Sequence, residues 1–124
     1  MVLTMAKGDD IQERLIDFAV NIIQLTTKLP KSSVRKHISG QTLRSGTSPA
    51  PNYAEARSAE SSKDFIHKLK IALKELNETA VWLQIIIRSK MLPLEECIEL
   101  QKECGELCRI IGASVRTSKK RRKK

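Results

Sequence analysis

Apolar residues recur at intervals of three and four positions along three long stretches, and this spacing constrains the fold most. It places each set of apolar side chains on one face of an α-helix, as in the seam of a helical bundle. The sets are Ile11, Leu15, Phe18, Ile22, Leu25 and Leu29; Phe65, Leu69, Leu73, Leu76, Ala80, Leu83 and Ile87; and Leu94, Ile98, Cys104, Leu107, Ile111 and Val115. With few aromatic residues, glycines and prolines, a turn-rich β sandwich is disfavoured. The 124 residues suffice for one domain with a hydrophobic core.

Polar caps and prolines predict where the helices begin and end. The expected N-terminal caps are Asp9 or Asp10, Ser32 or Ser33, and Ser61 or Ser62. Pro30 ends the first helix, because the residue before a proline disfavours helical geometry, and Pro93 begins the last. The long third helix is expected to run to about Ser89 and the last helix to about Thr117.

The second helix contains the residues least compatible with an uninterrupted helix. Gly46, Pro49 and Pro51 predict that it is interrupted or kinked near residues 46–52. The predicted fold class is therefore all-α, an antiparallel up-and-down four-helix bundle with a kinked second helix. The expected organisation is a flexible leader over residues 1–8, a bundle domain over 9–117 and a disordered polybasic tail over 118–124.

The formal net charge of +9 comes mainly from the last six residues. These are Lys119, Lys120, Arg121, Arg122, Lys123 and Lys124. Without them, 17 basic and 14 acidic residues leave a body that is only mildly basic. A polybasic segment can bind phosphate backbones or an anionic membrane surface, or it can serve solubility alone, and the sequence leaves these alternatives open.

Two further groups of cations lie on the expected helices. One group surrounds the first helix–helix connection and consists of Lys28, Lys31, Arg35 and Lys36. On the third helix, Lys63, Lys70 and Lys74 share one face, with Lys68 nearby. Such patches suit contacts to a nucleic-acid backbone, or they are ordinary solvated faces. Base stacking is disfavoured because aromatic side chains are scarce.

Two helices carry more apolar surface than a single core-facing stripe requires. The additional residues are Ile16, Val20 and Ile23 on the first helix and Trp82, Ile85 and Ile86 on the third. Contiguous apolar patches of this kind favour self-association, so these residues are the predicted oligomer interface. A wide core-facing sector is the alternative.

The sequence contains no recognisable catalytic or metal-binding pattern. A Gly-rich phosphate loop, an HExxH pair and a Glu-x-x-His pair are missing. Cys97, Cys104 and Cys108 share one helical stripe and are expected to pack in the core. We therefore expect no catalytic residues, cofactor or metal. No apolar run is long enough to cross a membrane and no export signal is visible, so the expected compartment is the cytoplasm.

The interrupted segment and the helix after it resemble a known family. Residues 41–48 read QTLRSGTS, residues 52–56 read NYAEA, and residues 62–76 read SKDFIHKLKIALKEL. This chain resembles the four helix bundle protein family encoded in intervening sequences of bacterial 23S rRNA genes. The resemblance covers about residues 11–117. It implies a four-helix protomer in a homopentameric ring, without an established enzyme activity.

The resemblance also suggests partners and motif residues. A related branch is the accessory protein of diversity-generating retroelements, which partners a reverse transcriptase and nucleic acid. The motif positions Arg44, Asn52 and Glu55 are expected to hold the kinked helix through an arginine–carboxylate contact and side-chain capping. The resulting hypothesis is a non-catalytic homo-oligomer that binds RNA or DNA electrostatically or assists a nucleic-acid enzyme. The alternative is a structural or protein-interaction scaffold without affinity for nucleic acid.

Overall fold

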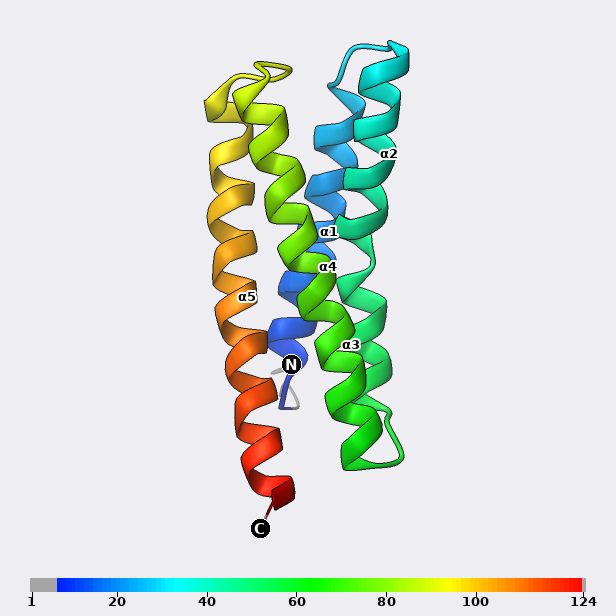
Figure 1. Ribbon diagram of the computed structural model, residues 1–124, viewed down its shortest axis with the longest axis vertical. Helices are drawn as coiled ribbons and strands as arrows, with labels where there is room; N and C mark the ends of the chain where they lie inside the picture. Colours follow the sequence, from blue (N-terminus) through cyan, green and yellow to red (C-terminus); the bar gives the residue numbers. More distant parts are fainter. Residues whose placement is uncertain (1–6, 124) are drawn as a thin grey trace, which may run out of the picture.

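The computed structural model describes residues 7–123 and confirms the antiparallel four-helix bundle (Figure 1). The helical segments are α1 (Asp9–Thr27), α2 (Ser33–Thr47), α3 (Pro49–Arg57), α4 (Ser62–Arg88) and α5 (Leu94–Lys123). Together, α2 and α3 form the second, bent helix of the bundle. The chain runs up through α1, down through α2 and α3, up through α4 and down through α5, so short connections join antiparallel neighbours.

The core is built from the apolar seams of all the helices. Phe18 and Ile22 of α1, Leu76 and Leu83 of α4, and Leu107 of α5 are completely buried. Cys97 and Cys104 are also buried in this core, and Cys108 is partly buried against it. These thiols therefore occupy the core-facing positions that their helical spacing predicts.

Serine caps fix the starts of two helices. The Ser32 hydroxyl accepts a hydrogen bond from the backbone N–H of Arg35 at 3.2 Å, and Ser61 accepts one from Asp64 at 3.1 Å. The start of α1 differs from the prediction. Gly8 occupies the cap position at φ 92°, in the left-handed region that glycine tolerates, so no side chain caps this helix. Asp9 and Asp10 lie instead in the first turn, where negative charge favours the helix dipole.

The bend between α2 and α3 occurs at Ser48, immediately before Pro49. A proline has no backbone N–H and its ring clashes with the preceding turn, so Pro49 and Pro51 interrupt the regular helical hydrogen bonds. The Asn52 side-chain amide donates to the Ser48 carbonyl and hydroxyl oxygens, both at 3.0 Å, and holds the junction. Gly46 has a different role from a helix breaker: a Cβ there would lie 2.8 Å from two carbons of Ile22, so glycine lets α2 approach α1 closely.

The C-terminal end of the described chain differs from the sequence prediction. Helix α5 does not end near Thr117 but continues to Lys123, so residues 118–123 are helical rather than a disordered tail. Lysine and arginine favour helices, and positive charge is stabilising at a helix C-terminus. At the other end, the Lys7 carbonyl accepts a hydrogen bond from Arg57 at 3.1 Å. Residues 1–6 of the predicted leader, and Lys124, lie outside the described residues. In the described part, no helix is long and apolar enough to cross a membrane.

Candidate nucleic-acid interface

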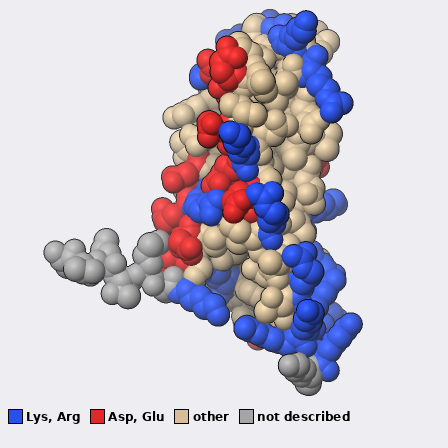
Figure 2. Space-filling model, turned by 90° about the vertical axis from the view of Figure 1, so that its left-hand side faces the viewer, with Lys and Arg blue, Asp and Glu red and all other residues tan. Residues whose placement is uncertain are grey.

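The last helix is divided into an acidic half and a basic half. Residues 94–106 contain five glutamates and one lysine, whereas residues 107–123 contain seven cations and no carboxylate side chain. Figure 2 faces this helix and shows acidic side chains over its middle and upper part, with a dense group of Lys and Arg at the lower end. The charge of α5 is therefore strongly asymmetric along its length.

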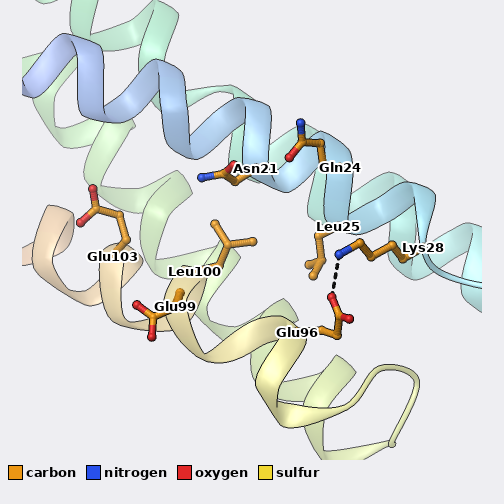
Figure 3. A pocket seen from close by; sticks show the side chains of 8 residues that line it. All are labelled: Asn21, Gln24, Leu25, Lys28, Glu96, Glu99, Leu100 and Glu103. Atoms are coloured by element: carbon orange, nitrogen blue, oxygen red, sulfur yellow. Dashed lines mark hydrogen bonds and ion pairs between the residues drawn. The ribbon is translucent and has the colours of Figure 1, made fainter.

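The acidic half of α5 is largely compensated by cations. Glu103 receives two hydrogen bonds from the Arg14 guanidinium of α1, at 2.6 and 3.0 Å, and this contact raises the pKa of Arg14. Glu96 pairs with the Lys28 ammonium at 2.6 Å across a groove between α1 and α5 (Figure 3). Lys28 is consequently separated from the basic cluster to which the sequence assigned it.

The basic end of the bundle combines cations from α4 and α5. We use the name basic face for six exposed residues, Lys63, Lys70 and Lys74 of α4 and Arg116, Lys119 and Lys123 of α5. None of the ion pairs found among residues 7–123 involves any of the six. Like charges lie side by side on two helices, because the Lys70 ammonium of α4 is close enough to Lys119 of α5 to lower the pKa of Lys119. Lys120, Arg121 and Arg122 are exposed on the same last turns of α5.

The other predicted cations lie at the opposite end of the bundle. A surface hollow at the connection between α1 and α2 is lined by Lys31, Arg35 and Lys36. Figure 1 shows this connection at the end of the bundle remote from the C-terminus. The nine predicted nucleic-acid-binding residues that the structure describes are therefore not on one surface. Arg116 was missed by that prediction, although its helical spacing from Lys119 and Lys123 puts it on the same face.

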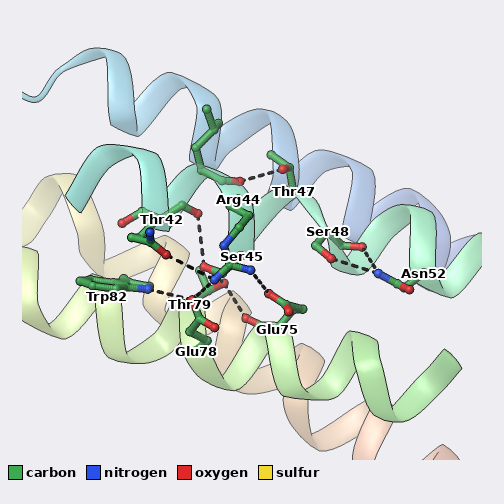
Figure 4. Close-up of polar contacts among 12 residues, drawn as sticks. Thr42, Arg44, Ser45, Thr47, Ser48, Asn52, Glu75, Glu78, Thr79 and Trp82 are labelled. Atoms are coloured by element: carbon green, nitrogen blue, oxygen red, sulfur yellow. Dashed lines mark hydrogen bonds and ion pairs between the residues drawn. The ribbon is translucent and has the colours of Figure 1, made fainter. Parts of the chain in front are cut away.

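The motif residues belong to the second, bent helix, with Arg44 on α2 and Asn52 and Glu55 on α3, and this helix packs against α4 (Figure 4). Arg44 forms ion pairs with Glu75, at 3.0 Å, and with Glu78. The Trp82 indole N–H donates to the same Glu78 carboxylate at 3.0 Å. Glu55 of α3 pairs with Lys68 of α4 at 3.3 Å. With the Asn52 contacts at the bend, these interactions tie the two parts of the second helix to the rest of the protomer.

A buried polar contact lies beneath this motif. The Thr79 hydroxyl of α4 donates to the Ser45 hydroxyl of α2 at 2.9 Å, and both side chains are fully buried. A buried hydroxyl must find a hydrogen-bond partner, so this pair fixes the register between the two helices. Sequence analysis missed this contact, because neither Ser45 nor Thr79 stands out from its neighbours along the chain.

The predicted oligomer interface is only partly on the surface. Ile16, Val20 and Ile23 of α1 are 39%, 44% and 46% exposed, and Ile85 of α4 is 37% exposed. Ile86 is completely buried within the protomer, so its assignment to an interface is wrong. Trp82 is partly buried against the core. Two exposed residues that the prediction omitted, Leu43 of α2 and Val81 of α4, add to the apolar surface.

The ionisable groups of the core suit packing rather than catalysis. Contact with Cys108 and burial raise the pKa of the Cys104 thiol, which stays protonated, whereas contact with Cys104 lowers the pKa of Cys108. Burial also raises the pKa of Cys97. Among residues 7–123, no three His, Cys, Asp or Glu side chains are grouped so that they could hold a metal ion.

Comparison with known proteins agrees with this fold. The model of the 23S rRNA-intervening sequence protein family matches residues 9–113. A crystal structure of a protein of unknown function from the S23 ribosomal protein family of Bacteroides thetaiotaomicron is 36% identical, with a TM-score of 0.80. That match covers 85% of this chain and 97% of the other. Among curated proteins, none matches. The basic segment from Arg116 onward lies beyond the family match, but the match includes almost all of the bundle: the chain belongs to the 23S rRNA-intervening sequence protein family.

Proposed function

We propose that this protein is a non-catalytic homo-oligomer that binds nucleic acid through its phosphate backbone. The observation that carries the proposal is the basic end of the bundle, where cations from two helices lie together without carboxylate partners among residues 7–123. When unpaired cations of a protein bind a polyanion, they release its condensed counterions, and this release favours binding. The name of the family, which refers to an intervening sequence of 23S rRNA, adds a nucleic-acid context.

Self-association is supported by the apolar row on α1. Ile16, Val20 and Ile23 follow spacings of four and three and remain about half exposed in the protomer. A row of aliphatic side chains loses unfavourable contact with water when a second copy covers it. Association also multiplies the basic ends in one particle, which raises the local positive potential. A pentamer is the expected number of copies, on the resemblance to ring-forming relatives.

Fluorescence anisotropy with labelled RNA and DNA, at low and at near-physiological salt, tests the proposed binding. We expect binding that weakens steeply with salt and depends little on sequence, because the contacts are to phosphates. Native mass spectrometry of the same sample gives the number of copies. Absence of binding at low salt, or tight binding insensitive to salt, contradicts the proposal.

The second candidate function is a scaffold that binds other proteins. It is favoured by the same apolar surface, including Leu43 and Val81, which a single interface need not cover completely. This alternative predicts a stable oligomer with no measurable affinity for RNA or DNA at about 150 mM salt. The two functions therefore separate in the binding experiment, whatever the oligomeric state.

A further inference from the structure

The basic face contains two rows of cations on antiparallel helices. On α4, Lys63, Lys70 and Lys74 repeat at intervals of seven and four, which keeps them on one side of the helix. At 1.5 Å rise per residue this row extends over roughly 16 Å. On α5, Arg116, Lys119 and Lys123 repeat at intervals of three and four and form the second row. The face thus presents charge in two dimensions rather than along a single tail.

The register between the helices brings the rows together. The Cys108 thiol of α5 contacts the Asn77 side chain of α4 at 3.4 Å, and two turns closer to the start of α4, Lys70 lies beside Lys119. The helices run in opposite directions, so Lys63, at the start of α4, lies toward Lys123, at the end of α5. Like charges held this close repel each other, and an anion placed between the rows relieves that repulsion.

Four glutamate side chains of α3, α4 and α5 form ion pairs with cations outside the basic face. Glu75 turns from α4 toward α2, where it pairs with Arg44. Glu55 is engaged with Lys68 on the α3 side of α4. Glu103 and Glu106 of α5 pair with Arg14 and Arg109. These four carboxylates are thus held by other cations and not by the basic face.

No base-stacking platform accompanies these charges. Phe18 is buried completely, and Tyr53, Phe65 and Trp82 are partly buried against the core. Proteins that bind single strands without sequence preference combine a cationic groove with aromatic side chains on which the bases stack. None of the four aromatic side chains is classed as exposed, so we take phosphates as the ligand chemistry of the basic face.

From this arrangement we infer that the basic face binds double-stranded nucleic acid. The lysine row of α4 is an essential half of this binding surface. The inference rests on the proposed function and narrows it to one surface and one form of ligand. A duplex carries one negative charge per roughly 1.7 Å of its axis, twice the density of either strand. Two rows of cations match two phosphate strands, whereas a polybasic tail alone does not distinguish a duplex from a flexible single strand.

The test replaces the α4 row in the full chain, as the triple variant Lys63→Gln, Lys70→Gln, Lys74→Gln. The matched control is Lys31→Gln, Arg35→Gln, Lys36→Gln, which removes the same charge from the opposite end of the bundle. Both variants keep α5 intact. Anisotropy is measured with a labelled RNA duplex, a DNA duplex of the same sequence, and each single strand, over a series of salt concentrations, with circular dichroism to check helix content.

We expect the unaltered chain to bind either duplex at least about 10-fold more tightly than the single strands, because the duplex offers a denser row of phosphates. The α4 variant should weaken duplex binding at least about 30-fold and reduce the salt slope by about 2 to 3, near one for each lost phosphate contact. The control variant should change duplex affinity less than about 3-fold, since the cations that it removes lie outside the proposed binding surface.

Three results would overturn the inference while leaving the proposed function in place. These are equal losses in the α4 variant and the control, equal affinity of the unaltered chain for duplex and single strand, or an α4 variant that binds duplex normally. Failure of the unaltered chain to bind any of the four probes at low salt would instead remove the proposed function itself. If the unaltered chain bound none of the four probes but did bind vesicles of anionic phospholipid, both the inference and the proposed function would be overturned.

Discussion

The two halves of α5 carry opposite charges, but they differ more in how those charges are used. In residues 94–106 the glutamates face cations: Arg14 reaches Glu103 with two hydrogen bonds, and Lys28 reaches Glu96. From Arg109 to the end of the helix every charged residue is a cation, and on α4 the Lys70 ammonium lies close enough to lower the pKa of Lys119. The acidic half therefore contributes to the protomer, whereas the basic half is where we propose that nucleic acid binds. Charge becomes available for binding only where packing supplies no partner.

The largest effect is expected when the basic half of α5 is removed. A chain ending at Thr117 loses six cations, and nucleic-acid affinity should fall about 100-fold or more in low-salt anisotropy. The free energy of unfolding should change by less than about 0.5 kcal/mol, because the exposed residues add little to the core. A second variant with glutamine at the same six positions separates charge from chain length. Retained affinity in both variants would show that the basic half is not the ligand site.

The next effect belongs to the body of the bundle and should leave binding unchanged. Gly46→Ala places a methyl group 2.8 Å from Ile22, and we expect a loss of about 1 to 3 kcal/mol in unfolding free energy by urea titration. The matched control is Gly40→Ala in the same helix, where no atom lies within 4 Å of the new Cβ. This control should gain about 0.5 to 1 kcal/mol from helix propensity. Equal effects of the two substitutions would contradict the close approach of α1 and α2.

A smaller effect tests whether the acidic half is structural. Arg14→Gln removes the paired contact to Glu103, and because both side chains are about one-third exposed, the expected loss in unfolding free energy is only about 0.5 to 1 kcal/mol. The double variant with Glu103→Gln should lose little more than either single variant, since one interaction is removed in all three. Nucleic-acid affinity should stay within about 2-fold. Strict additivity of the two losses would show that the pair does not interact.

The smallest effect concerns a single proton at the basic face. In the unaltered chain the neighbouring Lys70 ammonium holds the pKa of Lys119 below the ordinary lysine value of 10.5. A lowered folded-state pKa means that the folded chain binds fewer protons there, so this group makes the fold slightly more stable as pH rises toward 10.5. Lys70→Gln should return the pKa of Lys119 toward 10.5, whereas Lys70→Arg should keep it lowered. Side-chain NMR titration of the lysine Cε signals measures both, and an unchanged Lys119 in Lys70→Gln would show that the residues are apart.

Local signals in the sequence were sufficient to predict the fold. The serine caps at Ser32 and Ser61, the proline interruption at Pro49 and the apolar spacing each depend on residues a few positions apart. One boundary failed for a local reason as well. The lysines and arginines after Thr117 were interpreted as a solvated tail, although they favour helix and suit its C-terminus.

The site could be predicted only in part, because it depends on contacts between helices. The sequence identified the cations of α4 and α5, but not that Lys28 is paired with Glu96 or that Lys31 lies at the other end of the bundle. The same limit explains Ile86, which looks like part of an exposed stripe on its own helix. Only the packing of α4 against its neighbours shows that it is completely buried.

Lysine footprinting is a direct test of whether nucleic acid binds at the basic face, because it compares both ends of the bundle in one sample. The full chain is acetylated briefly with and without an RNA duplex, and modification at each lysine is quantified by mass spectrometry. Binding at the basic face predicts strong protection of Lys63, Lys70, Lys74, Lys119 and Lys123, with Lys31 and Lys36 modified as in the free protein. Protection of Lys31 and Lys36 instead, or equal protection of every exposed lysine, would contradict it.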